Sequence, residues 1–178
     1  TAFRRYTYKT TYAMIQVCDI EKSFDGTKVL KGVSATFETG KTNLIIGQSG
    51  SGKTVLMKSL VGLIRPEKGQ ILYDGRDLLK MSREQIQHLR TEIGMLFQGS
   101  ALFDSETVLG NVEFPLMMYT NMSFAERRKR ARFCLERVGL KGADAKFPSE
   151  ISGGMQKRVA IARAIALNPK YLFCDEPN

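Results

Sequence analysis

The sequence has few of the residues that usually hold disulfide-rich or metal-bound domains together. Its three cysteines, Cys18, Cys134 and Cys174, lie far apart and form no C-x-x-C pair. This spacing favours a reduced cytosolic protein over a disulfide framework. The single histidine, His88, has no cysteine or second histidine near it in the sequence, so we do not expect a histidine-based metal site.

Long apolar runs are also missing. No stretch approaches the roughly 18–20 consecutive apolar residues of a membrane-spanning helix, and the most apolar runs, such as 44–46 and 171–174, have the length of strands. Residues 1–17 include basic side chains but no apolar core segment, so they do not predict a signal peptide. We therefore expect any membrane association to come through a partner protein.

The charge is strongly of one sign but does not select one class of protein. Lysine and arginine number 27 against 18 acidic residues, which gives a net charge of +9. Such a surface would attract nucleotide phosphates, nucleic acid or anionic lipid headgroups. The basic run Glu126–Arg132 lies in an amphipathic helical pattern, so we interpret it as the exposed face of a helix.

Strand patterns alternate with helical ones along the 178 residues, a length that suits one domain. Alternation over Met14–Phe37, broken at Asp25-Gly26, predicts a β-hairpin. Further strands are predicted at Thr42–Ile46, Gly69–Tyr73, Ile93–Phe97 and Tyr171–Cys174. Helices are predicted over 55–63, from Ser82 and Ser123, which each have the form of a capping box, and over Ser152–Leu167. This order predicts an α/β core with a helical insert at 105–147.

One segment has the form of a phosphate-binding loop. Gly47–Thr54 (GQSGSGKT) fits G-x-x-x-x-G-K-[ST] and stands between a predicted strand and a predicted helix. We expect its backbone N–H groups to surround phosphates, Lys53 to reach the β- and γ-phosphates, and the Thr54 hydroxyl to bind Mg²⁺. The predicted nucleotide contacts are Gly47, Gln48, Ser49, Gly50, Ser51, Gly52, Lys53 and Thr54. The alternative is a glycine-rich turn without a ligand.

Two carboxylates follow the last predicted strand. In Tyr171–Glu176 (YLFCDE), Asp175 stands at the strand end, where it can hold Mg²⁺ through water, and Glu176 can polarise an attacking water. Without a phosphate loop upstream, a solvated acidic turn would be the better interpretation.

A second glycine-containing helix start occurs at Ile151–Arg158 (ISGGMQKR). By itself it predicts a serine-capped helix after a flexible turn. A protein with one nucleotide site has no evident need for two phosphate-binding helix starts. Two make sense if the second serves the ATP of a partner subunit.

Together these motifs resemble the ABC ATPase family over nearly the whole chain. Gly47–Thr54 matches Walker A, and Tyr171–Asp175 matches Walker B. The resemblance implies that Glu176 is the catalytic glutamate and that Ser152, Gly153 and Gly154 form the signature motif that contacts ATP.

Two further roles come from the resemblance alone. Gln98 matches the Q-loop glutamine, which links Mg²⁺ and the attacking water to the transport partner, so the implied metal-binding residues are Thr54, Gln98 and Asp175. Phe24 stands where the family places an aromatic that stacks on adenine, although taken alone it would predict a core residue.

The resemblance also implies an architecture. We expect a P-loop NTPase (RecA-like) α/β core in a single domain over 1–178, with an N-terminal antiparallel β subdomain and a helical subdomain at roughly 99–150. The family's D-loop and switch histidine would lie beyond Asn178. We therefore expect a C-terminally incomplete chain that binds ATP better than it hydrolyses it.

The segment Gly94–Leu116, with SGGM in place of SGGQ at the signature, resembles the Mla-type lipid-trafficking ATPases. This implies a head-to-tail ATPase dimer, a transmembrane permease and an MCE-type lipid-binding protein. It also implies a cytoplasmic position on the inner face of the bacterial inner membrane. The alternatives are an importer ATPase for another small substrate and a soluble ABC protein acting on ribosomes or DNA, although no nucleic-acid partner is expected.

Overall fold

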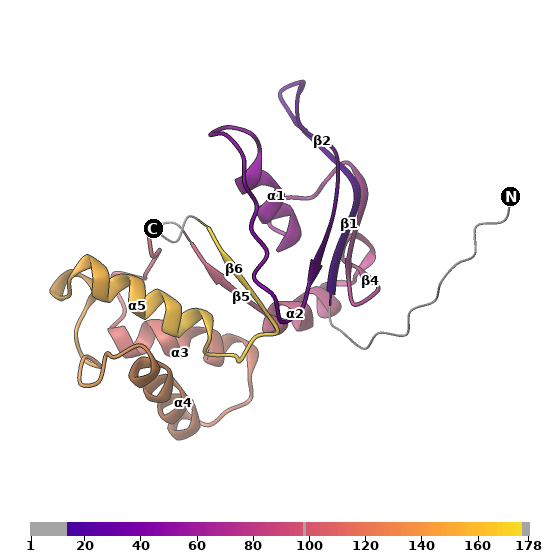
Figure 1. Ribbon diagram of the computed structural model, residues 1–178. Coiled ribbons are helices and arrows are strands. Elements are labelled where there is room, and N and C mark those ends of the chain that lie inside the picture. The colour runs from indigo at the N-terminus through magenta and orange to yellow at the C-terminus, as the bar shows by residue number, and fades with distance from the viewer. Residues whose placement is uncertain (1–13, 98, 176–178) are drawn as a thin grey trace, which may run out of the picture. The chain divides into compact units, whose positions relative to one another are not determined.

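The computed structural model describes residues 14–97 and 99–175, and the chain forms two compact units (Figure 1). The first unit ends at Met81 and the second begins at Ser82. Gln98 and Glu176, for which the family resemblance implies catalytic roles, lie outside the described residues.

The first unit is built on a four-stranded sheet with the order β2-β1-β3-β4. Its strands are β1 (Met14–Phe24), β2 (Thr27–Glu38), β3 (Lys68–Tyr73) and β4 (Arg76–Asp77). Every neighbouring pair is antiparallel. A short 3₁₀ helix, η1 (Leu78–Lys80), follows β4. The predicted N-terminal antiparallel sheet is therefore confirmed.

Two tight turns set the register of this sheet. Phe24 pairs with Thr27 across Asp25-Gly26, and both turn residues have positive φ angles, 47° and 77°. The same geometry recurs at Asp74-Gly75, with φ angles of 50° and 79°. Two consecutive left-handed residues make a type I′ turn, whose twist matches that of the flanking strands. The Asp-Gly pairs therefore fix both hairpins.

Helix α1 (Lys53–Leu60) lies in the same unit and is shorter than the predicted helix. The helix is closed by a Schellman arrangement in which Gly62, just after the C-cap Val61, has a φ of 73°. The Leu63 amide donates to the Lys58 carbonyl at 2.8 Å and the Gly62 amide to the Ser59 carbonyl at 3.1 Å. The Tyr73 hydroxyl of β3 donates to the Leu60 carbonyl at 2.9 Å. This buried bond ties the C-terminal end of the helix to the sheet.

The strand predicted at Thr42–Ile46 is wrong. The segment has no regular secondary structure, and the side chains of Leu44 and Ile46 are 78% and 83% exposed. A strand is stabilised by hydrogen bonds to a neighbouring strand, and no described strand pairs with this segment. The apolar sequence indicates that this segment favours the strand conformation. It does not show whether a neighbouring strand is available to pair with it.

In the second unit, β5 (Ile93–Leu96) and β6 (Tyr171–Cys174) form a parallel pair, with Ile93 opposite Tyr171 and Leu96 opposite Cys174. Helix α2 (Arg83–Glu92) precedes β5 and begins at Ser82 with the predicted capping box. Both predicted strands are confirmed, and their carboxyl ends lie at the same edge of the sheet.

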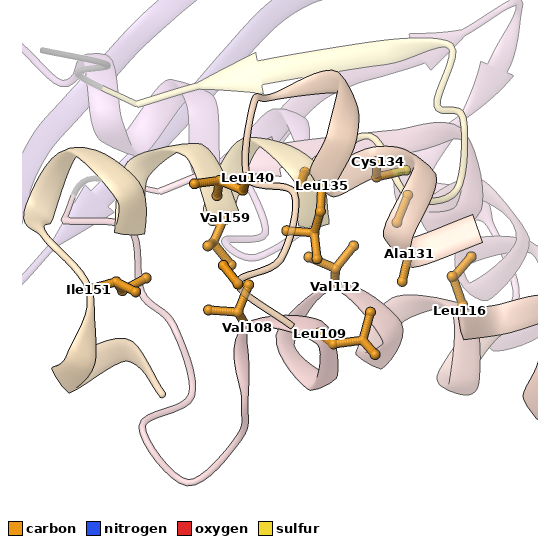
Figure 2. Close-up of a cluster of buried hydrophobic side chains, with 13 residues drawn as sticks. Val108, Leu109, Val112, Leu116, Ala131, Cys134, Leu135, Leu140, Ile151 and Val159 are labelled. Atoms are coloured by element: carbon orange, nitrogen blue, oxygen red, sulfur yellow. The ribbon is translucent and has the colours of Figure 1, made fainter. Parts of the chain in front are cut away.

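Three longer helices and a short 3₁₀ turn complete this unit. They are α3 (Val108–Tyr119), α4 (Phe124–Arg137), η2 (Pro148–Glu150) and α5 (Gly153–Ala164). The predicted capping box at Ser123 and Glu126 opens α4. The three α-helices share one apolar core, which includes Val112 of α3, Leu135 of α4 and Val159 of α5 (Figure 2).

The mixed α/β fold is thus confirmed, and helices fill the predicted insert. The single-domain organisation, with a helical subdomain at roughly 99–150, stays a prediction. Among the described residues, no helix is long and apolar enough to cross a membrane.

Candidate functional site

The phosphate loop leads directly into α1. Gly52 is the N-cap of the helix, with a φ of 93°, and no side chain caps the first turn. The first amide groups of a helix have no partner within the helix, and the helix dipole makes this end positive. The first turn also contains no acidic residue. The start of α1 can therefore accept an anion.

Lys53 organises the loop that precedes it. Its Nζ donates to the carbonyl oxygens of Gly47 and Gln48, both at 2.9 Å. The Ser51 amide also donates to the Gln48 carbonyl, at 3.2 Å. The loop is thus folded back around the ammonium group of Lys53, which is itself the first residue of α1. The arrangement combines two features that bind phosphate, backbone donors and a positive charge.

Gly52 brings this loop against β2. A Cβ atom at Gly52 would lie 3.1 Å from Val29 Cγ1 and 3.4 Å from the Val29 carbonyl oxygen. Val29 belongs to the hairpin whose turn follows Phe24. The Phe24 ring is 42% exposed, and Lys22 Nζ lies 5.3 Å from its centroid. The first unit therefore has a loop suited to phosphates and, at the end of β1, an accessible aromatic ring. The stacking role of Phe24 stays a prediction.

In the second unit, Asp175 continues the ladder beyond β6. Its amide donates to the Leu96 carbonyl at 2.9 Å, so the chain after β5 and the chain after β6 leave the sheet side by side. The Asp175 side chain is half-buried. This hydrogen bond places Asp175, the predicted metal-binding carboxylate, next to the carboxyl end of β5, after which the predicted Q-loop begins.

The predicted signature residues form the start of α5. The Ser152 hydroxyl accepts a hydrogen bond from the Met155 amide at 3.3 Å and so caps the helix. Ser152, Gly153 and Gly154 are exposed, and added Cβ atoms at the two glycines would meet nothing within 4 Å. Gln156 donates to the Pro148 carbonyl at 2.9 Å and so fastens the helix to η2.

Sequence reasoning missed two residues that hold the loop after Gln98. Asn111 of α3 is fully buried and bonds to backbone atoms of Phe103, Glu106 and Thr107. Arg163 of α5 donates to the carbonyl oxygens of Ser100 and Ala101. Asn111 could have been noticed in the sequence, because it and Glu113 are the two strongly polar residues of the mostly apolar stretch that forms α3. No local signal marked Arg163.

The described residues contain no group of three or more His, Cys, Asp or Glu side chains that could hold a metal ion. This does not conflict with Mg²⁺, which proteins commonly bind through one or two side chains together with substrate phosphates and water. The Thr54 hydroxyl and the Asp175 carboxylate are oxygen donors of the kind that Mg²⁺ prefers. The roles of individual site residues stay predictions.

Comparisons with known proteins agree with this geometry. Residues 30–178 match the family model described as ABC transporter. Over 164 residues the chain is 43% identical to the "Probable ribonucleotide transport ATP-binding protein mkl" of Mycobacterium tuberculosis, covering 92% of this chain and 46% of the relative. It is 46% identical over 138 residues to the "Intermembrane phospholipid transport system ATP-binding protein MlaF" of Haemophilus influenzae, covering 78% and 52%.

A third relative, the "Methionine import ATP-binding protein MetN" of Carboxydothermus hydrogenoformans, is 42% identical over 167 residues, covering 92% of this chain and 49% of the relative. The chain thus spans about half the length of these curated relatives. Among solved structures, the dimeric ATP-binding cassette MJ0796 in a post-hydrolysis state with ADP and Pi has a TM-score of 0.84 and 33% identity, covering 92% of this chain and 74% of the other. The chain belongs to the ABC transporter family.

Proposed function

We propose that this chain is the nucleotide-binding part of the ATP-hydrolysing subunit of a transporter, with ATP bound at Gly47–Thr54. The observation that carries the proposal is the loop folded around Lys53 at the uncapped start of α1. When phosphates enter, the Lys53 ammonium can exchange two carbonyl partners for phosphate oxygens, which carry more negative charge. The adjacent amides of α1 would donate to the same phosphates.

We propose that Thr54 and Asp175 hold Mg²⁺, which would neutralise charge on the phosphates. The resemblance adds Gln98 to this set. Glu176, the residue after Asp175 in the sequence, is the proposed base that orients the attacking water. Asp175 is well suited to its part because its backbone is fixed by the hydrogen bond to Leu96.

The start of α5 supports a head-to-tail dimer. Gly153 and Gly154 face open space, so no packing within the described chain requires glycine there. Two adjacent glycines that contact nothing leave room for a close approach by another molecule. We propose that this molecule is the ATP on a second subunit, with Ser152 as a contact. The similar cassette MJ0796 is itself dimeric.

Helix α3 supports a membrane-embedded partner. Its sequence is apolar almost all round, a pattern typical of a helix that is buried on every side. One side is nevertheless open: Met117 and Met118 are 55% and 53% exposed. Phe114 lies on the same side, and its ring centroid is 4.7 Å from that of Phe103 in the loop after Gln98. We propose that a cytoplasmic helix of the permease covers this apolar side.

For the transported substrate we propose a phospholipid moved between bacterial membranes, together with an MCE-type lipid-binding protein. The support is the similarity to MlaF, whose name describes intermembrane phospholipid transport. Similarity to MetN keeps a small-molecule importer as the second candidate. In both cases the ATPase would lie on the cytoplasmic face of the inner membrane, held there by the permease.

Nucleotide binding is tested by the thermal shift of the full-length protein with Mg-ATP. Ligand at 100 times its dissociation constant stabilises the folded state by about 2.7 kcal/mol, which raises Tm by several degrees. Lys53→Ala removes a charge-assisted contact to phosphate and should weaken ATP binding about 10- to 100-fold.

The matched control is Lys58→Ala, which removes a lysine from the last turn of the same helix. It should keep the full ATP shift. An equal loss of the shift in both variants would show that α1 had been perturbed as a whole. No shift in the folded wild-type protein would refute nucleotide binding.

Permease docking is tested by charge insertion on the open side of α3. Met118→Glu should abolish co-purification with the permease, because docking would bury the new carboxylate without a partner. Phe133→Glu on α4 is the control, since Phe133 is also about half exposed, at 49%, but belongs to another helix. Retention of the permease by Met118→Glu would contradict the proposed surface.

A further inference from the structure

The loop after Gln98 has an unusual backbone. Gly99, Ser100 and Ala101 have φ angles of 74°, 69° and 45°, so three consecutive residues lie in the left-handed region. Only the first is glycine; side chains of L-residues are disfavoured in this conformation. Such a backbone persists where the surrounding structure holds it in place.

Arg163, near the end of α5, supplies that hold. Its Nη1 donates to the Ala101 carbonyl and its Nη2 to the Ser100 carbonyl, both at 2.9 Å. The guanidinium carbon also lies 5.7 Å from the centroid of the Phe103 ring. The planar fork of arginine fits two adjacent acceptors at once, whereas the ammonium of lysine acts as a single point. Burial lowers the pKa of Arg163, so these contacts replace water that the guanidinium has lost.

A second anchor holds the next part of the loop. Asn111 Oδ1 accepts from the Phe103 amide at 2.8 Å, and its Nδ2 donates to the Phe103 carbonyl at 3.1 Å. Asn111 belongs to α3, the helix into which the loop leads, so this anchor is local. Arg163 lies more than 60 residues from the carbonyls it binds and connects the loop to a different helix.

The connected helix carries the proposed signature residues at its other end. Helix α5 has 12 residues, a length of about 18 Å, and Val159 and Ala162 fix its middle in the core shared with α3 and α4. A displacement of the Ser100 and Ala101 carbonyls would move both acceptors of Arg163. Either the C-terminal end of α5 follows, and the helix tilts, or both bonds break.

We propose that Arg163 is a positioning residue that couples the loop after Gln98 to the Ser152–Gly154 end of α5. The inference rests on the proposed function, because it assumes that a permease docks near this loop and that Ser152–Gly154 contacts ATP. It adds a direction of communication: docking shifts the loop, and Arg163 passes the shift to α5. Coupling of this kind requires a structural element whose position depends on both sites, and we propose that α5 is that element.

Arg130 provides a matched control. From α4, its Nε donates to the Ala166 carbonyl at 2.8 Å and its Nη2 to the Ile165 carbonyl at 3.1 Å. It therefore also holds two adjacent carbonyls near the C-terminal end of α5, although through Nε and Nη2 rather than Nη1 and Nη2. Its guanidinium carbon lies 5.3 Å from the centroid of the Phe133 ring. Ile165 is the C-cap of α5 and Ala166 follows it, so neither carbonyl belongs to the loop after Gln98.

The experiment uses the full-length ATPase, alone and assembled with its permease in proteoliposomes. We would measure kcat and KM for ATP in the wild type, Arg163→Gln, Arg163→Lys and Arg130→Gln, together with the Tm of each. For Arg163→Gln we expect a KM within twofold of the wild type and at least a fivefold loss of the stimulation of kcat by the permease. Arg163→Lys should recover less than half of that stimulation, and Arg130→Gln should keep it.

Equal losses in Arg163→Gln and Arg130→Gln would overturn the inference, because the effect would then reflect the stability of α5. Full stimulation in Arg163→Gln would overturn it as well. If Arg163→Gln does not fold, the double variant Ser100→Gly/Ala101→Gly tests the link from the loop side. It keeps Arg163 but frees the backbone, and it should also lose stimulation; full stimulation would refute the coupling.

The Mg-ATP thermal shift separates this failure from that of the proposed function. A wild-type protein that binds Mg-ATP and is stimulated by the permease upholds the proposed function, whatever the variants do. A wild-type protein with no thermal shift would refute the proposed function itself.

Discussion

Helices α1 and α5 both begin at a glycine-containing segment, but the contacts around the two N-termini differ. The loop before α1 is folded around Lys53 and packed against β2 at Gly52, and no side chain caps the helix. The start of α5 is capped by its own Ser152, and its two glycines contact nothing. The first has the backbone donors and the cation of a phosphate site within one chain. The second has open space beside its glycines, which one side of a shared site would need.

The strongest test of the first start is Gly52→Ala. The new Cβ would lie 3.1 Å from Val29 Cγ1, at a φ of 93° that alanine disfavours. We expect a stability loss of about 2 kcal/mol from strain and crowding, measured by urea unfolding, and ATP binding at least tenfold weaker.

Gly50→Ala is the control for Gly52→Ala. Gly50 also has a positive φ, 77°, but an added Cβ would meet nothing within 4 Å. It should lose about 1 kcal/mol from the backbone alone. Equal losses in the two variants would mean that the packing against Val29 is unimportant.

The second start is tested by Ser152→Ala. Loss of the cap to Met155 should cost about 1 kcal/mol of stability and reduce ATP hydrolysis of the full-length protein at least tenfold. Ser123→Ala removes a corresponding cap from α4 and should cost similar stability with hydrolysis near the wild-type rate. Equal effects of both variants on hydrolysis would show that Ser152 acts only as a helix cap.

The smallest expected effect on stability comes from Gly154→Ala. The position is helical, has an ordinary φ and is open, so alanine should stabilise the fold by about 0.4–1 kcal/mol. Hydrolysis by the dimer should nevertheless fall, since the methyl group would occupy the space proposed for the partner's ATP. A variant that is both more stable and fully active would show that this space is not used.

Sequence reasoning succeeded where the signal is local. The Asp25-Gly26 turn and the capping boxes at Ser82 and Ser123 were predicted because each is set by residues within three or four positions. The strand predicted at Thr42–Ile46 is absent from the structure. A strand forms only with a pairing partner, and no described strand pairs with this segment.

The same distinction applies to the candidate site. The motif at Gly47–Thr54 predicts both the loop and its lysine, and the structure shows the loop folded around Lys53. The hold of Arg163 on Ser100 and Ala101 joins residues more than 60 positions apart and leaves no mark in the local pattern. Motifs predict the groups that would contact a ligand, whereas the contacts that position those groups appear only in the three-dimensional structure.

The exposed ring of Phe24 has a consequence for the choice of nucleotide. Stacking uses the flat face of a base, and every base has one. If the proposed site holds its ligand through the first amides of α1, the charge of Lys53 and the ring of Phe24, it would recognise a triphosphate far better than it would distinguish adenine from guanine. Its use of ATP would then reflect the supply of nucleotides in the cell, and GTP should compete with ATP at similar concentrations.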